Sequence, residues 1–264
     1  VSWKDDGCLW VKASGTRIGD ALTSDIFVPV DLELLKQEIS SGNFDASPVL
    51  LTESHRRPSI ETMFHGILHQ KYVVHLHEIN ILSYLVGKNG KSDCERLMPD
   101  ELKWVFVDYY KPGPQLAEAI FKSSIKYAEL DVIFLQNHGV IVADNNLEIL
   151  SDKLDRLKDL FNIEPCPIIS HGLYEKEKVP ASLLGEFSWV VEPEINALAI
   201  DVTLLEHVMN NWALYPDHIV FLGSNAKVVE LGELDRQSLN ELEKNKFIFI
   251  PNYGVLKHIK TKSA

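Results

Sequence analysis

Cysteine is scarce in this chain. Three cysteines occur among 264 residues, at positions 8, 94 and 166, and no two of them form a C-x-x-C pair. An odd, scattered set argues against a disulfide framework or a cysteine-only metal site, and we predict a reducing, cytoplasmic location. No run of 18 residues is apolar and free of charge, so we predict no membrane span.

Positive charge is also in deficit, with 26 Lys and Arg against 38 Asp and Glu and a net charge of −12 at pH 7. An acidic protein repels nucleic acid and anionic membranes on average, so we predict neither as a partner. A phosphate ligand would therefore need a local positive pocket. The first residues, Val1-Ser2-Trp3-Lys4, read like the middle of an element and include no Met, so we expect further residues upstream.

Apolar residues make up 45% of the chain, which is ordinary for a globular protein. Short β-rich runs alternate with helical patterns throughout, which predicts α/β or α+β layers. Among them we predict strands over 72–77 and 218–222, a helix that starts at Pro58 and a polar loop over 87–92. The run Glu164-Pro165-Cys166-Pro167 marks a boundary, so we predict domains 1–165 and 166–264.

Two nine-residue segments echo each other, Ile-Phe-Leu-Gln-Asn-His-Gly-Val-Ile at 133–141 and Ile-Phe-Ile-Pro-Asn-Tyr-Gly-Val-Leu at 248–256. Asn-x-Gly between β-rich runs indicates a hairpin. One interpretation is two unrelated hairpins with the same turn chemistry. The other is that the C-terminal domain is a degenerate repeat of the first, without its metal ligand.

Histidines form the most informative pattern. His75 and His77 are two residues apart in a predicted strand, so their side chains share one face. The best third ligand is His138, at the Gly-supported hairpin turn. Three histidines with one open position are typical of a catalytic zinc site. The alternative is that the strand pair is ordinary core or surface histidine.

Two further groups of residues can bind or react. Ser14-Gly15-Thr16 follows a strand and offers backbone N–H groups and hydroxyls to a phosphate, and Ser59 adds a hydroxyl. On the predicted Pro58 helix, Glu61 and His65 lie four residues apart, as a solvated pair or as a carboxylate at the metal edge. Local positive charge would come from four residues: Lys12, Arg17, Arg56 and Arg57.

Taken in order, four segments resemble the class II aldolase/adducin family. They are Leu-Trp-Val-Lys-Ala-Ser-Gly-Thr (9–16), Arg-Pro-Ser-Ile-Glu-Thr (57–62), Val-His-Leu-His (74–77) and Gln-Asn-His-Gly (136–139). The resemblance covers roughly residues 1–162. It implies an α/β fold of three layers with a central mixed β-sheet, here followed by a smaller α/β C-terminal extension. It also implies a homo-oligomer, usually a tetramer.

The same resemblance implies roles for individual residues. Zinc, or another divalent metal, would bind His75, His77 and His138, and Glu61 would be the acid/base group. The phosphate of a sugar phosphate would bind at four residues: Ser14, Gly15, Thr16 and Ser59.

The chain departs from the family pattern in four places. Ile60 stands where the second phosphate-loop serine belongs, and the Gly-Asn pair expected just before Val1 is absent. No catalytic tyrosine aligns clearly; Tyr109, Tyr110 and Tyr253 are candidates, and we select Tyr110. The last hundred residues extend beyond the small aldolases of the family.

The implied function is a zinc-dependent aldolase, a lyase that cleaves a sugar phosphate by a retro-aldol reaction through a metal-bound enediolate. The alternatives are a sugar-phosphate 4-epimerase or dehydratase on the same scaffold. A further alternative is a non-catalytic, adducin-like interaction domain.

Overall fold

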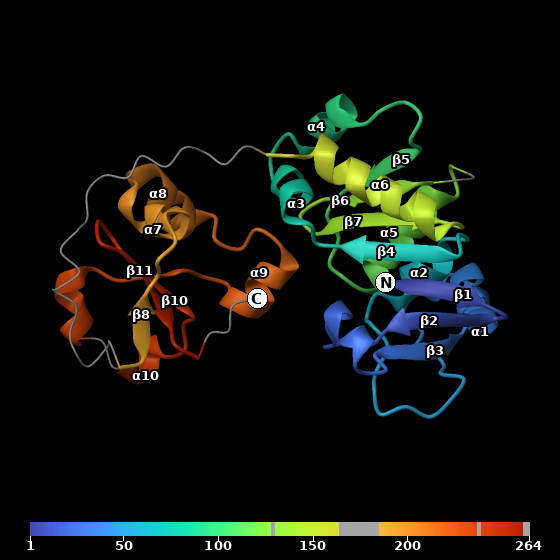
Figure 1. The fold of residues 1–264 in the computed structure, drawn as a ribbon, viewed down its shortest axis with the longest axis horizontal. Coiled ribbons are helices and arrows are strands. Elements are labelled where there is room, and N and C mark those ends of the chain that lie inside the picture. The colour runs from blue at the N-terminus through green and yellow to red at the C-terminus, as the bar shows by residue number, and fades with distance from the viewer. Residues whose placement is uncertain (128–129, 164–184, 237–238, 261–264) are drawn as a thin grey trace. The chain divides into compact units, whose positions relative to one another are not determined.

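The computed structural model describes residues 1–127, 130–163, 185–236 and 239–260, and the chain divides into two compact units. The first unit is Val1–Ile163 and the second unit is Glu164–Ala264 (Figure 1). The predicted boundary between 165 and 166, and Cys166 with it, lies outside the described residues. No helix in the described part of the chain is long and apolar enough to cross a bilayer.

The first unit is built on a seven-stranded mixed sheet with the order β3-β2-β1-β4-β7-β6-β5. Its neighbours are antiparallel except β5 and β6, which run parallel. The strand β4, which carries His75 and ends just before His77, therefore lies in the middle of the sheet beside β7. The strands are β1 Ser2–Asp5, β2 Cys8–Lys12, β3 Phe27–Asp31, β4 Tyr72–Leu76, β5 Trp104–Val107, β6 Val132–Leu135 and β7 Gly139–Asp144.

Helices cover both faces of this sheet, so the predicted three-layer fold with a central mixed sheet is confirmed. Strand alternation separates the two cores: Ile133 and Leu135 pack with α2 and α5, whereas Val132 and Phe134 pack with α3, α4 and α6. One face carries α2 (Thr62–Ile67) and α5 (Pro114–Ser124), with α1 (Leu32–Ser40) beside α2. The other carries α3 (Ile79–Leu85), α4 (Gly90–Leu97) and α6 (Leu147–Leu160).

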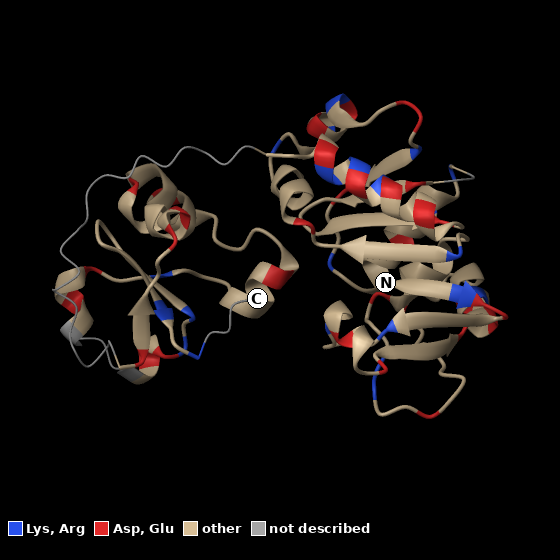
Figure 2. Ribbon diagram, viewed as in Figure 1, with Lys and Arg blue, Asp and Glu red and all other residues tan. Residues whose placement is uncertain are grey.

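The helix α6 shows how the sequence selects its layer. Leu150 and Leu157 are buried against the sheet. Acidic and basic residues alternate over much of the helix surface (Figure 2), which is the pattern of a half-exposed amphipathic helix. The side chain of Asn146 caps its first turn by accepting from the backbone N–H of Glu148 at 2.8 Å.

Three sequence-based element predictions were wrong. The helix predicted from Pro58 begins only at Thr62, because Pro58 forms an isolated antiparallel bridge with Ala13. The predicted loop over 87–92 already contains the start of α4 at Gly90. The predicted strand over 218–222 is the helix α9, Pro216–Leu222, whose proline suits a first helical turn.

The second unit has a four-stranded sheet with the order β8-β11-β10-β9. One face packs a core with α7 and α8, and the opposite face packs a separate core that includes Leu234 and Leu242. The C-terminal extension is therefore a smaller α/β unit. Its strands are β8 Phe187–Trp189, β9 Lys227–Val228, β10 Phe247–Ile250 and β11 Gly254–His258. Its helices include α7 Pro193–Ile200, α8 Val202–Asn210, α9, and α10 Leu239–Leu242, with a 3₁₀ turn at Leu231–Arg236.

Candidate metal centre

The turn between β6 and β7 positions His138. Leu135 pairs with Gly139 to close it, and the backbone N–H of His138 donates to the carbonyl of Leu135 at 3.1 Å. Asn137 adopts a left-handed conformation with φ 52°, which asparagine tolerates better than most residues. Its N–H donates to the carbonyl of Leu85 at the end of α3, at 3.2 Å. The turn is thus fixed to both the sheet and a helix.

Strand β4 positions the histidine pair. His75 lies opposite Ile141 of β7, and Nδ1 of His75 lies 3.1 Å from the carbonyl oxygen of Val140. A carbonyl can only accept, so this contact places the proton on Nδ1 and leaves the lone pair of Nε2 for a metal. Nε2 of His75 lies 3.0 Å from Nε2 of His77, just beyond the strand end.

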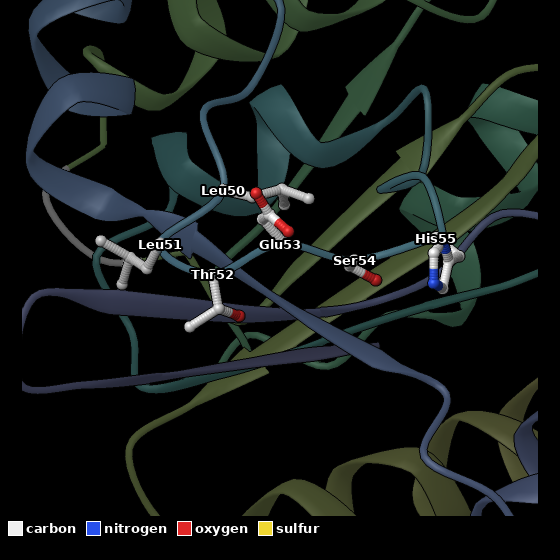
Figure 3. A pocket seen from close by; sticks show the side chains of 6 residues that line it. All are labelled: Leu50, Leu51, Thr52, Glu53, Ser54 and His55. Atoms are coloured by element: carbon white, nitrogen blue, oxygen red, sulfur yellow. The ribbon is translucent and has the colours of Figure 1, made fainter.

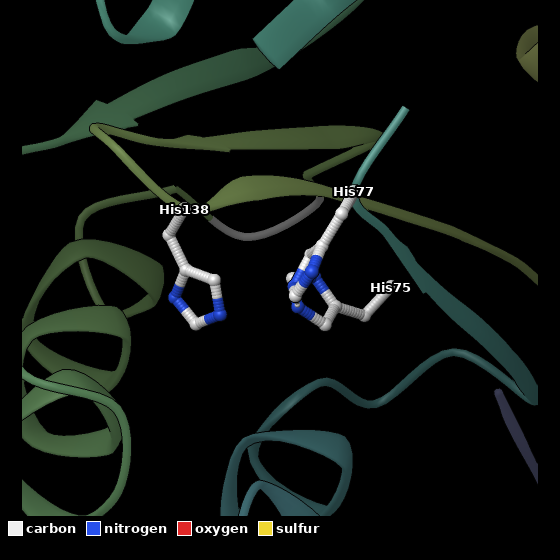
Figure 4. Close-up of side chains that lie close together, drawn as sticks. All are labelled: His75, His77 and His138. Atoms are coloured by element: carbon white, nitrogen blue, oxygen red, sulfur yellow. Dashed lines mark hydrogen bonds between the residues drawn. The ribbon is translucent and has the colours of Figure 1, made fainter. Parts of the chain in front are cut away.

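The three predicted ligands converge, although they come from β4 and from a turn more than sixty residues later. The ring centroids are 4.8 Å apart for His75 and His77, and 5.0 Å apart from His138 in both cases. One nitrogen of each ring lies within 4.8 Å of the others, and Figure 4 shows the rings turned toward one point. Tetrahedral zinc with bonds of about 2 Å requires nitrogens about 3.4 Å apart, which small ring movements would achieve.

Glu61 completes the cluster. Its Oε1 lies 3.0 Å from Nε2 of His138, and its Oε2 lies 3.6 Å from Nε2 of His75. The solvated Glu61–His65 pair predicted from helical spacing was wrong, because Glu61 precedes α2 rather than lying within it. His65 is instead buried and shares a 2.8 Å hydrogen bond with the hydroxyl of Ser2.

The protonation states in this cluster suit a metal. Burial lowers the pKa of His75 to about 3, so its imidazole is neutral at pH 7, which is the ligand form. Burial acts to raise the pKa of Glu61, but the hydrogen bond from His138 and the neighbouring imidazoles lower it to about 2. The carboxylate is therefore ionised although its side chain is only 15% exposed. A cation bound here would offset that buried negative charge.

A second observation also fits a bound divalent metal. Nδ1 of His138 is buried and has no hydrogen-bond partner among the described residues. Buried polar atoms are rarely left unsatisfied, and an ion or a ligand beside the ring is one ordinary explanation. Neutral imidazole nitrogens and one carboxylate are donors that zinc and similar divalent metals accept. The residues present therefore fit a divalent metal.

Gly139 is a site residue that the sequence reasoning did not single out. A Cβ atom there would overlap the carbonyl oxygen of Leu76 and lie 2.8 Å from Cδ2 of His77 and 3.2 Å from Cε1 of His75. Only glycine allows β7 to approach the two histidines this closely. Glycine directly after the turn histidine was the available signal.

We therefore expect Gly139→Ala to weaken metal binding at least about tenfold and to cost about 1–3 kcal/mol of stability. The reason is that the backbone carbonyl of Leu76, unlike a flexible side chain, cannot rotate away from the new methyl group. Metal titration and thermal unfolding would measure both. The control is Gly19→Ala, since a Cβ at exposed Gly19 meets nothing within 4 Å. Wild-type metal affinity in Gly139→Ala would refute the steric argument.

The predicted phosphate-binding residues lie together. The Ala13–Pro58 bridge and a 2.9 Å hydrogen bond from the N–H of Ser14 to the carbonyl of Arg57 join the Ser14-Gly15-Thr16 turn to the segment of Ser59. The N–H of Ser14 is thus already used, and so is the hydroxyl of Thr16, which donates to Ala13 at 2.7 Å. Remaining candidate donors are the N–H of Gly15 and the hydroxyls of Ser14 and Ser59.

Lys12 connects this turn with the metal cluster. Its ammonium donates to the carbonyl of Thr16 at 2.7 Å. Burial lowers the pKa of Lys12, while the negative charge of Glu61 acts in the opposite direction, which places Lys12 within electrostatic reach of the cluster. Lys12 thus supplies positive charge at the turn in an otherwise acidic protein.

Tyr110, the predicted proton donor, lies in the loop between β5 and α5 and is 42% exposed. The N–H of its neighbour Tyr109 donates to Oε1 of Gln136 at 3.2 Å, which ties this loop to the turn that carries His138. Among the described residues, no hydrogen bond or ion pair joins Tyr110 to the three histidines, so its role stays a prediction.

A separate cavity of about 730 Å³ lies along one stretch of chain, Leu50 to His55 (Figure 3). The histidine cluster is not part of its lining. The predicted phosphate-binding residues are not part of its lining either, so the cavity is assigned to neither group.

A three-layer α/β domain whose three histidines and one glutamate meet at one point defines a class of protein able to hold a divalent metal. Residues 1–164 match the family described as the Class II Aldolase and Adducin N-terminal domain, and the chain belongs to this family.

Two solved structures and one curated protein are similar to parts of the chain. The N-terminal class II aldolase domain of a conserved protein from Thermoplasma acidophilum shares the fold, with 22% identity and a TM-score of 0.50 over 61% of this chain and 80% of that one. An aldolase II superfamily protein from Pseudomonas syringae is 17% identical, with a TM-score of 0.45 over 61% of this chain and 62% of that one.

The curated protein is the uncharacterized oxidoreductase YuxG of Bacillus subtilis, 26% identical over 140 residues. The match covers 50% of this chain and 20% of YuxG, so the chain spans about a fifth of that relative's length.

Proposed function

We propose that the protein is a metal-dependent aldehyde-lyase, an aldolase that cleaves a sugar phosphate by a retro-aldol reaction, with zinc as the metal. The observation that carries this proposal is the convergence of His75, His77 and His138 with an ionised Glu61 at 3.0 Å from His138. Family membership supports the same reaction class.

The three imidazoles would hold the metal, and Glu61 would handle the proton. When bound, a divalent metal acts as a Lewis acid that polarises carbonyl and hydroxyl oxygens and stabilises negative charge. The ionised carboxylate of Glu61 can take the proton from the nucleophilic carbon in the condensation direction, and in cleavage its protonated form returns a proton to that carbon. Its hydrogen bond to His138 aims it at the point where the three rings meet.

Substrate binding would use the turn at Ser14-Gly15-Thr16 and the hydroxyl of Ser59. Lys12 supports this assignment, since its ammonium lies at that turn, where it donates to the carbonyl of Thr16. Tyr110 would act at the hydroxyl next to the broken carbon–carbon bond: it would take that hydroxyl's proton during cleavage and would donate a proton to the aldehyde oxygen in the reverse, condensation direction. We further propose a small-molecule sugar phosphate as partner, no nucleic acid or membrane, and a homo-oligomer, in keeping with the family.

A direct test combines metal analysis with product detection. The purified protein should contain about one zinc per chain and should release dihydroxyacetone phosphate from one member of a panel of ketose 1-phosphates. Chelation should abolish the release, and added zinc should restore it. An isomeric pentulose phosphate as product would identify an epimerase, and loss of water a dehydratase. Absence of both metal and turnover would favour an adducin-like interaction domain and overturn the proposal.

A further inference from the structure

The sheet of the second unit repeats part of the first. We call Tyr72–Asp144, from β4 to β7, the first module, and Phe187–His258, from β8 to β11, the second module. In the first module the spatial order is β4-β7-β6-β5, and in the second it is β8-β11-β10-β9. When the strands of each module are numbered by their order along the chain, their order across the sheet is first, fourth, third, second in both modules. Both have two antiparallel contacts followed by one parallel contact.

The hairpin turns agree in detail. Asn252 has φ 65°, as Asn137 has φ 52°, and the N–H of Tyr253 donates to Ile250 at 2.9 Å, as His138 donates to Leu135. The closing pair is Ile250 with Gly254. Over the nine aligned positions, five residues are identical.

Shared turn chemistry alone does not account for the helix contact beneath each turn. The N–H of Asn252 donates to the carbonyl of Ala199 at 3.0 Å, and the N–H of Asn137 donates to that of Leu85. Ala199 lies ten residues after Trp189, and Leu85 lies ten residues after His75. The helices α7 and α3 thus hold the two turns at matching positions.

Strand register then fixes which residues correspond. Leu256 pairs with Trp189, as Ile141 pairs with His75. Three residues beyond Trp189 and His75, a glutamate occupies the N-cap of the next helix in each module, Glu192 and Glu78.

The two cores divide in the same way. In the second module Phe249 and Val255 pack with α7, just as Phe134 and Val140 pack with α3 in the first module. On the opposite face of each sheet lie the corresponding aliphatic residues: Ile248, Ile250 and Leu256 in the second module, and Ile133, Leu135 and Ile141 in the first.

We propose that the second module is a degenerate copy of the metal-binding module, in which Trp189, Val191 and Tyr253 replace His75, His77 and His138. None of the three replacements offers an imidazole, and Val191 is 85% exposed. Glycine is kept after the turn, but its close neighbour differs: a Cβ at Gly254 would lie 2.5 Å from Oδ1 of Asn196 and 3.5 Å, an ordinary contact distance, from Cζ3 of Trp189. Among the described residues, the histidine group able to hold a metal lies in the first module, and the second module is a scaffold that has lost its ligands.

Restoring the ligands tests this correspondence, which rests in part on the proposed metal centre. The variant Trp189→His/Val191→His/Tyr253→His, made in the full chain, should bind two Co²⁺ per chain, against one in the wild type. Elemental analysis and the visible absorption of cobalt with nitrogen ligands would count and characterise the sites. Val191→His alone is the control, since one added imidazole should leave the count at one.

The outcomes separate the two proposals. A wild-type chain without metal, combined with a gain of one Co²⁺ in the restored variant, would refute the first centre and support the repeat. A folded restored variant that still binds one Co²⁺ would overturn the repeat and leave the first centre intact. A wild-type chain that already binds two Co²⁺ would also overturn the repeat. Because Trp189 packs against the core, the variant Val191→His/Tyr253→His is the second measurement. It should bind a second, weaker Co²⁺, and failure of both variants to do so would also overturn the repeat.

Discussion

Replacing His75 with alanine should remove the metal and abolish lyase activity while the chain remains folded. His75 is one of the three proposed ligands and is oriented by its hydrogen bond to Val140, so its loss would leave two imidazoles that no longer define a site. Loss of an outer-shell partner alone weakens metal binding about 10–100-fold, and loss of a ligand should exceed that. Elemental analysis, a coupled assay for the released ketose phosphate fragment and circular dichroism would measure the three quantities.

The matched control for His75→Ala is His69→Ala, an exposed histidine of the same unit. It should keep the wild-type metal content and turnover. Activity that persists in His75→Ala after chelation would remove the metal from the mechanism altogether.

Replacing Glu61 with glutamine should lower turnover about 10²–10⁴-fold, the range expected when a positioned acid/base group is lost. The amide preserves the shape of the side chain but cannot accept a proton as the carboxylate does. Because all three imidazoles remain, the metal content should stay near one per chain. Steady-state kinetics and elemental analysis on the same preparation separate the two effects.

The control for Glu61→Gln is Glu33→Gln on the exposed surface of α1, where Glu33 pairs only with Lys36. A Glu61→Gln protein with wild-type turnover would show that the carboxylate only compensates charge near the histidines. A protein that lost its metal would assign Glu61 to metal binding and not to proton transfer.

Both expectations depend on geometry that the sequence predicted only in part. Alternation along a strand placed His75 and His77 on one face before any coordinates were known, and Asn-x-Gly predicted the hairpin that carries His138. Helical spacing failed at Glu61, because the extended backbone at Pro58 pairs with Ala13 and delays the helix to Thr62. Glu61 therefore lies at the N-cap of α2 and not within the helix.

The second unit shows the same division between local pattern and long-range contact. Nine residues were enough to notice the echo between the hairpins, but they could not distinguish shared turn chemistry from a repeat. The strand order, the anchor from Asn252 to Ala199 and the pairing of Trp189 with Leu256 are contacts between distant segments. No local pattern encodes them.

The sequence by itself determined the alternation of helices and strands, the acidic charge and the identity of the residues able to bind a metal, because these depend on composition and on spacing over a few residues. Only the tertiary structure decided that His138 meets His75 and His77, that Glu61 joins them, and that Gly139 leaves room for their approach. Burial and the pairing of β4 with β7 fix those positions, and both arise only when distant segments pack together.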